Sequence, residues 1–203
     1  PDSQDLLVDS RLRMSVGDEW TGLLNLSNLS VNLNGEDCLT RKILNGSQHP
    51  IRFLSEIAFA SKKSGLRPEL ILSVVKQESR FSPSVKSTVG AVGLMQLLPE
   101  TANEVQGDSI NVSDLLDPKT NVYLGAMYLR KLLNRWNDNL FLAVASYNAG
   151  SSNVEDWIST ELYSEPELWV ERIPYPETRI YIKKVIGGLW SYINHDKKIC
   201  LKS

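Results

Sequence analysis

Apolar side chains recur at helical spacing through most of the chain from residue 50 onward. A period of about 3.6 residues predicts amphipathic helices, whereas half-buried strands would show strict alternation. Prolines that suit a first helical turn, and glycines that suit the position after a last turn, support the limits of these helices. The expected helices cover residues 51–64, 68–80, 118–136, 140–148 and 177–194, with a shorter one that begins at Pro99. The side chains assigned to core faces include Ile51, Leu54, Ile57, Ala58, Val122, Ala126, Leu129, Leu132, Leu133, Trp136, Ile180, Val185, Leu189 and Ile193.

The first 49 residues follow a less regular pattern than the rest. A short helix is expected over residues 5–14. Between residues 25 and 34, leucine or valine alternates with asparagine or serine, which leaves two interpretations open: an extended, hairpin-like piece, or a loop packed on the main body. We therefore expect a structural extension over residues 1–49 and a helical domain over residues 50–203. The fold class is mainly α, and a small β element near the N-terminus remains open.

Size and charge limit the functions that this chain can have. A chain of 203 residues is long enough for one sizeable core. The 22 basic and 24 acidic side chains form no strongly basic stripe, so neither nucleic acid nor an anionic membrane is an expected partner. No apolar run approaches the roughly 18 residues of a transmembrane helix. The chain begins at Pro1 without methionine, which leaves open that a leader or lipid anchor has been removed.

The two cysteines and two histidines do not form a metal-binding motif. Cys38 and Cys200, even with His49 and His195, lack the spacing of a structural zinc site, and we expect neither a metal nor a cofactor. Two interpretations of the cysteines stay open. One is a disulfide between Cys38 and Cys200, which would imply an oxidising compartment, and the other is two unrelated thiols.

One charged residue stands on an apolar helix stripe. The positions Ile71, Val74 and Val75 recur at helical spacing, and the next place on the same face is Glu78. A carboxylate there is costly unless it is paired, solvated or protonated, and burial raises a carboxyl pKa. Because Pro83 disfavours continuation of the helix, Glu78 lies in the last turn, where the helix dipole also disfavours ionisation. Glu78 is thus a candidate general acid, or else a partly exposed glutamate at a frayed helix end.

Further motifs follow this helix and make the first interpretation of Glu78 the better one. Residues 90–99 read Gly-Ala-Val-Gly-Leu-Met-Gln-Leu-Leu-Pro within an expected ordered loop over residues 82–98, and residues 145–150 read Ala-Ser-Tyr-Asn-Ala-Gly. In this order and at this separation, the motifs resemble the soluble lytic transglycosylases, the glycoside hydrolase family 23 group related to goose-type lysozyme. The resemblance runs from about residue 50 to about residue 194. The pieces that carry it are 77–79 with Ser87, 90–99, 117–121, 145–150 and 173–181.

The resemblance implies a lysozyme-like helical domain with a glycan groove, located in the bacterial cell envelope, periplasmic or exported. It implies cleavage of the β-1,4 bond between N-acetylmuramic acid and N-acetylglucosamine in peptidoglycan, with a 1,6-anhydro product formed without water. Glu78 would be the single acid and base, since the site motifs contain no second carboxylate of comparable standing and ordinary glycosidases use two. A goose-type hydrolase and a non-catalytic glycan-binding scaffold are the alternatives. Partners other than peptidoglycan strands, such as cell-wall or secretion machinery, remain open.

The resemblance also assigns roles to side chains around Glu78. Tyr147 is expected to act beside Glu78, with its hydroxyl near the acetamido group or the charge at C1. Substrate-binding roles are implied for a larger set. Its members are Ser87, Met95, Gln96, Leu98, Asn148 and Glu177. Leu98 replaces a methionine that many relatives carry, which keeps an apolar surface and loses a flexible thioether.

Several of these residues keep a second interpretation. Glu177 also suits the first turn of a helix, where an acid is favourable. Tyr181 is either a hydrogen-bond partner near the catalytic loop or a core tyrosine. Trp157, Trp169 and Tyr175 are either sugar-stacking platforms or, more commonly for such aromatics, core residues.

Overall fold

The structure is a computed structural model that describes residues 3–32 and 46–194. Within these residues the regular structure is helical and contains no strand. Two isolated bridges, which involve residues 86, 92 and 97, tie together the loop between two helices. The helices are α1 Ser3–Ser15, α2 Glu19–Asn32, α4 Leu54–Ser64, α5 Pro68–Ser79, α6 Pro99–Gln106, α7 Pro118–Arg135, α8 Leu140–Ala149, α9 Ser151–Glu155, α10 Glu161–Ser164, α11 Pro166–Arg172 and α12 Pro176–Ile193, with a 3-10 turn η1 at Asp114–Leu116. The mainly α fold class is confirmed.

The helix limits follow the local signals in the sequence. The Asp117 side chain accepts a hydrogen bond from the Thr120 amide at the start of α7, as an N-cap aspartate does. Gly65 ends α4 in the left-handed region, with φ of 70°. Pro68, Pro99 and Pro118 each stand at the first turn of a helix. The helices expected at 5–14, 68–80, 118–136, 140–148 and 177–194 are all present within a few residues of the expected limits.

The N-terminal region differs from the expectation. Neither an extended piece nor a loop is formed at the start of the 25–34 segment, because Glu19–Asn32 is the helix α2. Leu23, Leu26 and Leu29 are three residues apart and all buried, and this helical spacing dominates over the alternation of leucine with polar residues. The β element proposed near the N-terminus is absent from the described residues.

Two expected core faces are also partly wrong. α4 begins at Leu54 rather than Ile51, and the Leu54 side chain is 63% exposed. Its buried face is instead formed by Ile57, Ala60 and Ser64. In α12, Ile180 is 52% exposed, while the neighbouring Tyr181 and Ile182 are buried. Ile57, Val185 and Leu189 are buried as expected, so the errors are confined to the exposed residues Ile51, Leu54, Ala58 and Ile180.

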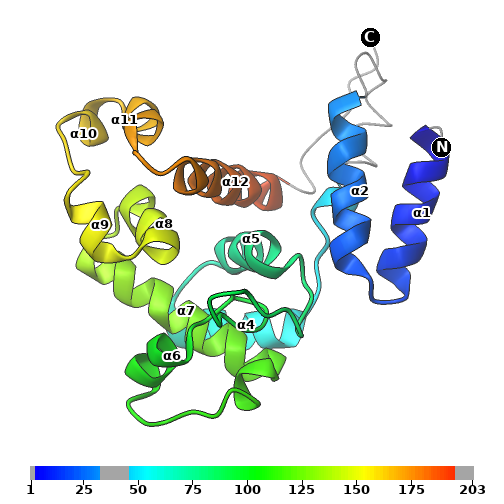
Figure 1. The fold of residues 1–203 in the computed structure, drawn as a ribbon, viewed down its shortest axis with the longest axis horizontal. Coiled ribbons are helices and arrows are strands. Elements are labelled where there is room, and N and C mark those ends of the chain that lie inside the picture. The colour runs from blue at the N-terminus through cyan, green and yellow to red at the C-terminus, as the bar shows by residue number, and fades with distance from the viewer. Residues whose placement is uncertain (1–2, 33–45, 195–203) are drawn as a thin grey trace.

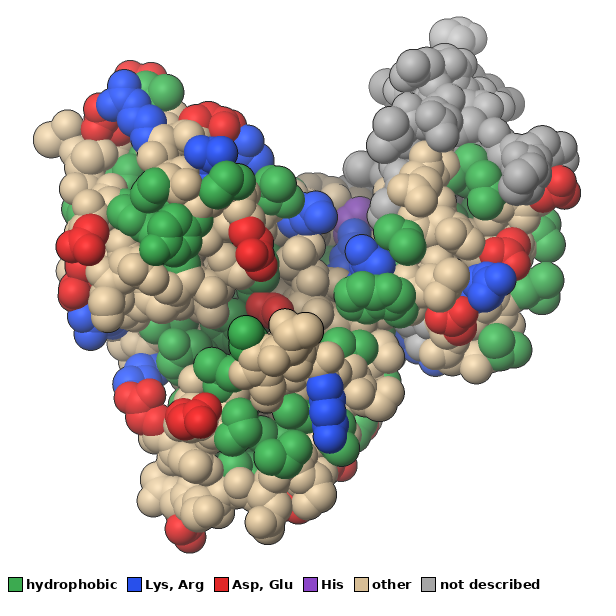
Figure 2. Space-filling view, viewed as in Figure 1, with side chains coloured by type: hydrophobic (Ala, Val, Ile, Leu, Met, Phe, Trp, Pro, Cys, Tyr) green, Lys and Arg blue, Asp and Glu red, His purple; other side chains and the backbone are tan. Residues whose placement is uncertain are grey.

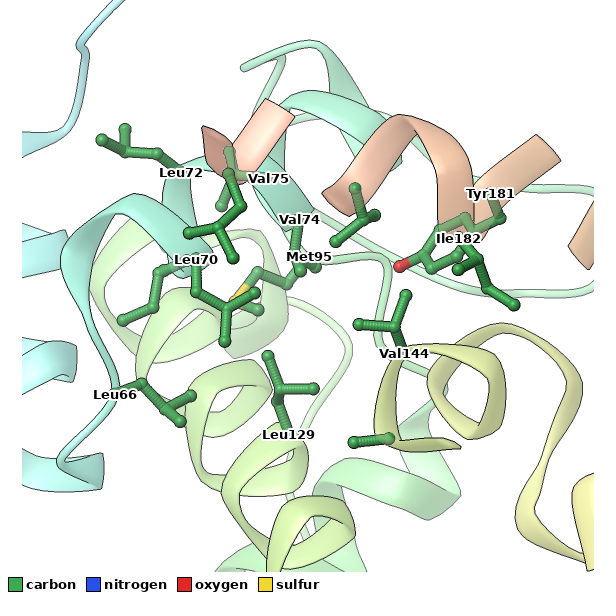
Figure 3. Close-up of a cluster of buried hydrophobic side chains, with 14 of the residues drawn as sticks. Leu66, Leu70, Leu72, Val74, Val75, Met95, Leu129, Val144, Tyr181 and Ile182 are labelled. Carbon is green, nitrogen blue, oxygen red and sulfur yellow. The ribbon is translucent and has the colours of Figure 1, made fainter. Parts of the chain in front are cut away.

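α5 is the central helix of the main body. It packs against α12, α4 and α7, while α8 packs against both α7 and α12 (Figure 1). Val74 of α5, Leu129 of α7, Val144 of α8 and Ile182 of α12 meet in one buried cluster (Figure 3). α1 and α2 pack on each other as a pair, which lies beside the main body in Figure 1. The boundary between residues 1–49 and 50–203 stays a prediction.

Two remaining expectations concern the membrane and the cysteines. Among the residues that the structure describes, no helix combines the length and the apolar character needed to cross a membrane. Cys38 and Cys200, for which the sequence leaves a disulfide open, both lie outside the described residues.

Candidate active site

Glu78 occupies the last turn of α5, which ends at Ser79. The chain then turns sharply, because Arg80 and Phe81 both have positive φ, at 49° and 63°. The Phe81 side chain is completely buried, and this burial anchors the turn against the core. The end of the helix before Pro83 agrees with the sequence expectation and leaves Glu78 next to the negative end of the helix dipole.

Tyr181 of α12 is the hydrogen-bond partner of Glu78. Its hydroxyl donates to Oε1 of the carboxyl group at an oxygen–oxygen distance of 2.5 Å. The tyrosine is only 4% exposed and also belongs to the hydrophobic core. Both interpretations of Tyr181 from the sequence therefore hold, and the contact joins α5 to α12 at the site.

The surroundings raise the pKa of Glu78 to about 7. Burial of the carboxyl group is the largest cause, since it disfavours the charged form. The hydrogen bond from Tyr181 opposes this effect and lowers the pKa, while the negative charge of Glu177 raises it further. At neutral pH, Glu78 is therefore close to its titration midpoint, which suits a group that acts as an acid or as a base.

Two tyrosines near Glu78 remain protonated. The pKa of Tyr147 and that of Tyr181 both lie well above the usual value of 10, first because the rings are buried and second because of the Glu78 charge. The Tyr147 hydroxyl donates to the carbonyl oxygen of Met95 at 2.9 Å. Its ring lies 5.4 Å from that of Tyr128 on α7. Tyr147 is thus held between the glycine-containing loop and α7.

A buried asparagine holds the loop that faces Glu78. The Oδ1 atom of Asn121 accepts a hydrogen bond from the Met95 amide at 2.7 Å, and its Nδ2 donates to the carbonyls of Val92 and Leu115, both at 2.8 Å. A Cβ atom at Gly93, which has φ of 81°, would lie 2.3 Å from that same Nδ2. The glycine is therefore needed for this close approach. Asn121 lies within the 117–121 motif, to which the sequence assigned no role at the site.

The position of Met95 does not agree with the expectation that its side chain contacts substrate. Its side chain is 0% exposed and packs against Gly125, where an added Cβ would lie 2.6 Å from the sulfur. Only its backbone reaches the site, through the hydrogen bond with Tyr147. Gln96, the next residue, has φ of 46° and uses its side-chain amide to bind the carbonyls of Val85 and Gly93.

A cleft of about 550 Å³ opens beside Glu78. It brings together most of the residues predicted for the site. Those on its wall are Glu78, Ser87, Gln96, Leu98, Tyr147, Asn148 and Glu177. Ser87 Oγ accepts a hydrogen bond from the Ala91 amide at 2.9 Å, and Asn148 Oδ1 accepts one from Thr178 at 2.7 Å. Both side chains therefore combine a bracing contact with a place on the cleft wall.

The cleft also contains residues that the sequence did not indicate. Tyr128 and Thr101 line it, and neither belongs to a motif piece; Ser146 of the 145–150 piece also lines it, although the sequence assigned it no role. The three aromatic residues considered as sugar-stacking platforms differ in their exposure and contacts. Trp169 is a core residue at 1% exposure, while the half-exposed Tyr175 packs edge-on against Trp157, with ring centroids 4.9 Å apart. Within the described ranges 3–32 and 46–194, no cluster of His, Cys, Asp and Glu is suited to hold a metal ion.

Comparison with known proteins finds a matching domain family and relatives that are named lytic murein transglycosylases. The family model described as the transglycosylase SLT domain matches residues 55–170. The soluble lytic murein transglycosylase of Escherichia coli strain K12 is 36% identical over 135 residues, which cover 62% of this chain and 21% of that protein. The membrane-bound lytic murein transglycosylase F of Desulfosudis oleivorans is 36% identical over 148 residues, or 68% of this chain and 32% of that protein.

A solved structure extends the similarity to almost the whole chain. The X-ray structure of an inactive glutamate-to-glutamine mutant of lytic transglycosylase Slt from Pseudomonas aeruginosa matches with a TM-score of 0.81 at 28% identity. It covers 99% of this chain and 32% of that one, so the likeness includes α1 and α2, which lie outside the family model. The chain spans only 21% to 32% of the length of these relatives. With more than half of its residues matched by the family model and its lysozyme-like helical fold shared, this chain belongs to the transglycosylase SLT domain family.

Proposed function

We propose that this chain is the catalytic domain of a lytic murein transglycosylase. It cleaves the β-1,4 bond between N-acetylmuramic acid and N-acetylglucosamine in peptidoglycan without water and leaves a 1,6-anhydro end. The observation that carries the proposal is Glu78, whose carboxyl group has a pKa raised to about 7 and lies on the wall of an open cleft. The names of the relatives and the inactive glutamate-to-glutamine mutant of the Pseudomonas aeruginosa protein support it.

The first step is protonation of the leaving group. Protonated Glu78 donates its proton to the glycosidic oxygen, and the bond from that oxygen to C1 of the muramic acid breaks. Positive charge then develops at C1, where the acetamido group of the substrate assists. The Tyr147 hydroxyl donates its hydrogen bond to the Met95 carbonyl. Its oxygen lone pairs are therefore free to stabilise the positive charge at C1.

The second step uses the same carboxylate as a base. Ionised Glu78 takes the proton of the C6 hydroxyl group as that oxygen attacks C1, and the new bond closes the 1,6-anhydro ring. Glu78 is then protonated again and ready for another cycle. The hydrogen bond from Tyr181 stabilises the ionised form between the two steps, so that the carboxyl group does not stay locked in its acid form.

The remaining side chains of the cleft bind the glycan in this proposal. Ser87, Gln96 and Asn148 offer polar groups to sugar hydroxyl and amide groups, and Leu98 offers an apolar surface. Met95 acts only through its backbone, since its side chain is buried. Peptidoglycan strands are the proposed substrate and partner, and the bacterial cell envelope is the proposed location of the reaction.

One observation favours a second candidate, hydrolysis of the same bond. Glu177 lies on the same cleft and its charge raises the pKa of Glu78, so a second carboxylate is present near the site. Such a group can orient a water molecule for attack, as in two-carboxylate glycosidases. Digestion of purified sacculi separates the two. Fragments that end in 1,6-anhydro sugars support the transglycosylase, and fragments with only reducing ends would establish the hydrolase.

A further inference from the structure

A second cavity of about 530 Å³ lies on the opposite side of α5 from the cleft. Lys76 and Glu78 are two residues apart, which places them about 200° apart around the helix. Lys76 lines this second cavity and Glu78 lines the cleft, and the two sets of lining residues have no member in common. The cavity is therefore a separate feature of the molecule and has no part in the proposed reaction.

The cavity is formed where α5 crosses α12. Ser73 and Gly188 meet at this crossing, since a Cβ atom at Gly188 would lie 2.3 Å from Ser73 Oγ. The Ser73 hydroxyl donates to the carbonyl of Val185 at 2.6 Å and fixes the crossing further. Trp20 of α2 also lines this space. Its shape therefore depends on both the N-terminal helical pair and the main body.

Four basic side chains line this cavity, and we call it the basic pocket. They are Lys76 on α5, Arg80 directly after the end of α5, and Lys183 and Lys184 on α12. Figure 2 shows Lys and Arg side chains gathered in the hollow between the two parts of the molecule. The described part of the lining contains no Asp or Glu. The chain as a whole is slightly acidic, so this concentration of positive charge is a local feature.

Three of these cations have no carboxylate partner among the described residues. Lys183 forms an ion pair with Glu171 at 2.5 Å. Arg80 instead stacks on Trp20, with its guanidinium carbon 4.1 Å from the ring centroid, which holds its planar donors in place. Lys76 is largely buried, and its pKa is lowered to about 8, first by burial and second by the charge of Lys184. Folding thus brings together positive charges that repel one another, and a bound anion would relieve this repulsion.

We propose that the basic pocket is a binding site for a phosphate-bearing ligand. Lys76, Arg80 and Lys184 would together meet two or three negative charges, which a pyrophosphate-like group supplies in a compact volume and a single carboxylate does not. Gly187, where an added Cβ would meet nothing within 4 Å, leaves room for the ligand beside the backbone, and Ser191 supplies a hydroxyl group. The phosphate belongs either to a free small molecule or to a lipid headgroup.

The test measures binding of inorganic pyrophosphate to the whole chain by isothermal titration calorimetry. Lys76→Gln combined with Lys184→Gln is expected to weaken binding by at least about tenfold, since two charge-assisted contacts are lost. The matched control is Lys62→Gln combined with Lys63→Gln, which removes the same charge from the exposed end of α4 and should leave binding unchanged. Glu78→Gln should also bind normally, so this result does not depend on the proposed reaction.

Two further arms identify the source of the phosphate and the competing chemistry. Vesicles that contain phosphatidylglycerol, compared with phosphatidylcholine vesicles, should displace pyrophosphate if a lipid headgroup fills the pocket, and should not if the ligand is soluble. The proposal is overturned if the wild-type chain shows no saturable binding of pyrophosphate. It is equally overturned if both double variants lose binding alike, or if a triglutamate peptide binds more tightly than pyrophosphate. Thermal unfolding of each variant checks that the chain remains folded.

Discussion

Tyr181 donates its hydroxyl proton to Oε1 of Glu78 at 2.5 Å, across 103 residues of sequence. The contact joins the end of α5 to α12, two helices that pack along the core. It opposes the effect of burial on the Glu78 pKa, which nevertheless rises to about 7. We infer that the two helices set the balance between the acid and base forms of the Glu78 carboxyl group.

Replacement of Tyr181 by Phe should raise the Glu78 pKa above its present value. The variant loses a hydrogen bond that stabilises the ionised form, so the acid form persists to higher pH. The base step then slows, and we expect activity at neutral pH to fall roughly tenfold. A pH–rate profile on sacculi measures this shift. An unchanged profile, or one displaced to lower pH, would contradict the assigned role of the hydroxyl group.

Glu78→Gln should stabilise the fold as pH rises. The folded pKa of Glu78 is about 7 against a usual value of 4.5, so its ionisation costs stability between these two values. The ionised carboxylate therefore destabilises the wild-type fold most above pH 7. There the unfolding free energy of the amide variant should exceed that of wild type by roughly 1–3 kcal/mol, with little difference below pH 4. Urea unfolding at pH 4 and pH 8 tests the sign. A variant that is less stable than wild type at pH 8 would show that the carboxylate is not in an unfavourable environment.

Glu177 should affect the pKa of Glu78 without being essential for cleavage. Its negative charge raises the Glu78 pKa, so Glu177→Gln should lower that pKa and move the pH optimum in the acid direction. Cleavage should continue, with a loss of about tenfold or less, because Glu78 performs both proton transfers in the proposed mechanism. Complete loss of turnover in this variant, together with normal glycan binding, would favour a two-carboxylate hydrolase.

Asn121 should be important for the loop rather than for the chemistry. Its side chain satisfies three backbone groups in the loop and near η1, and it is completely buried. Asn121→Ala leaves those groups unpaired, and we expect a loss of roughly 2–4 kcal/mol in unfolding free energy. Asn134→Ala, at an exposed position of the same helix, is the control and should be nearly neutral. Equal effects from both variants would remove the proposed role of Asn121.

Most residues that the sequence assigns to the site line one cleft, whereas several expectations about the surrounding helices are wrong. Glu78 could be recognised because a carboxylate interrupted an apolar stripe just before a proline, and both signals are local. Tyr181 could not be assigned, since its partner lies 103 residues away and periodicity does not report which helices cross. Met95 was misplaced for a similar reason: the side chain lies in the core against Gly125, and only its carbonyl faces the site.

The same limit explains the errors in the fold. In α2 the polar residues between leucines suggested an alternating, extended pattern. The residues that are buried in the core are instead Leu23, Leu26 and Leu29, which are three positions apart as in a helix. In α4 the exposed Leu54 and the buried Ala60 reverse the order that side-chain hydrophobicity suggests. Which face of a helix is buried depends on its neighbours, and tertiary packing therefore decides where the local pattern is ambiguous.

The central claim is that Glu78 cleaves peptidoglycan with no water entering the product. Digestion of sacculi in water labelled with heavy oxygen, followed by mass spectrometry of the released fragments, tests it directly. We predict 1,6-anhydro muramic acid ends without heavy oxygen from the wild-type chain, and no release by Glu78→Gln. Reducing ends that carry heavy oxygen, or unchanged release by the variant, would contradict the account.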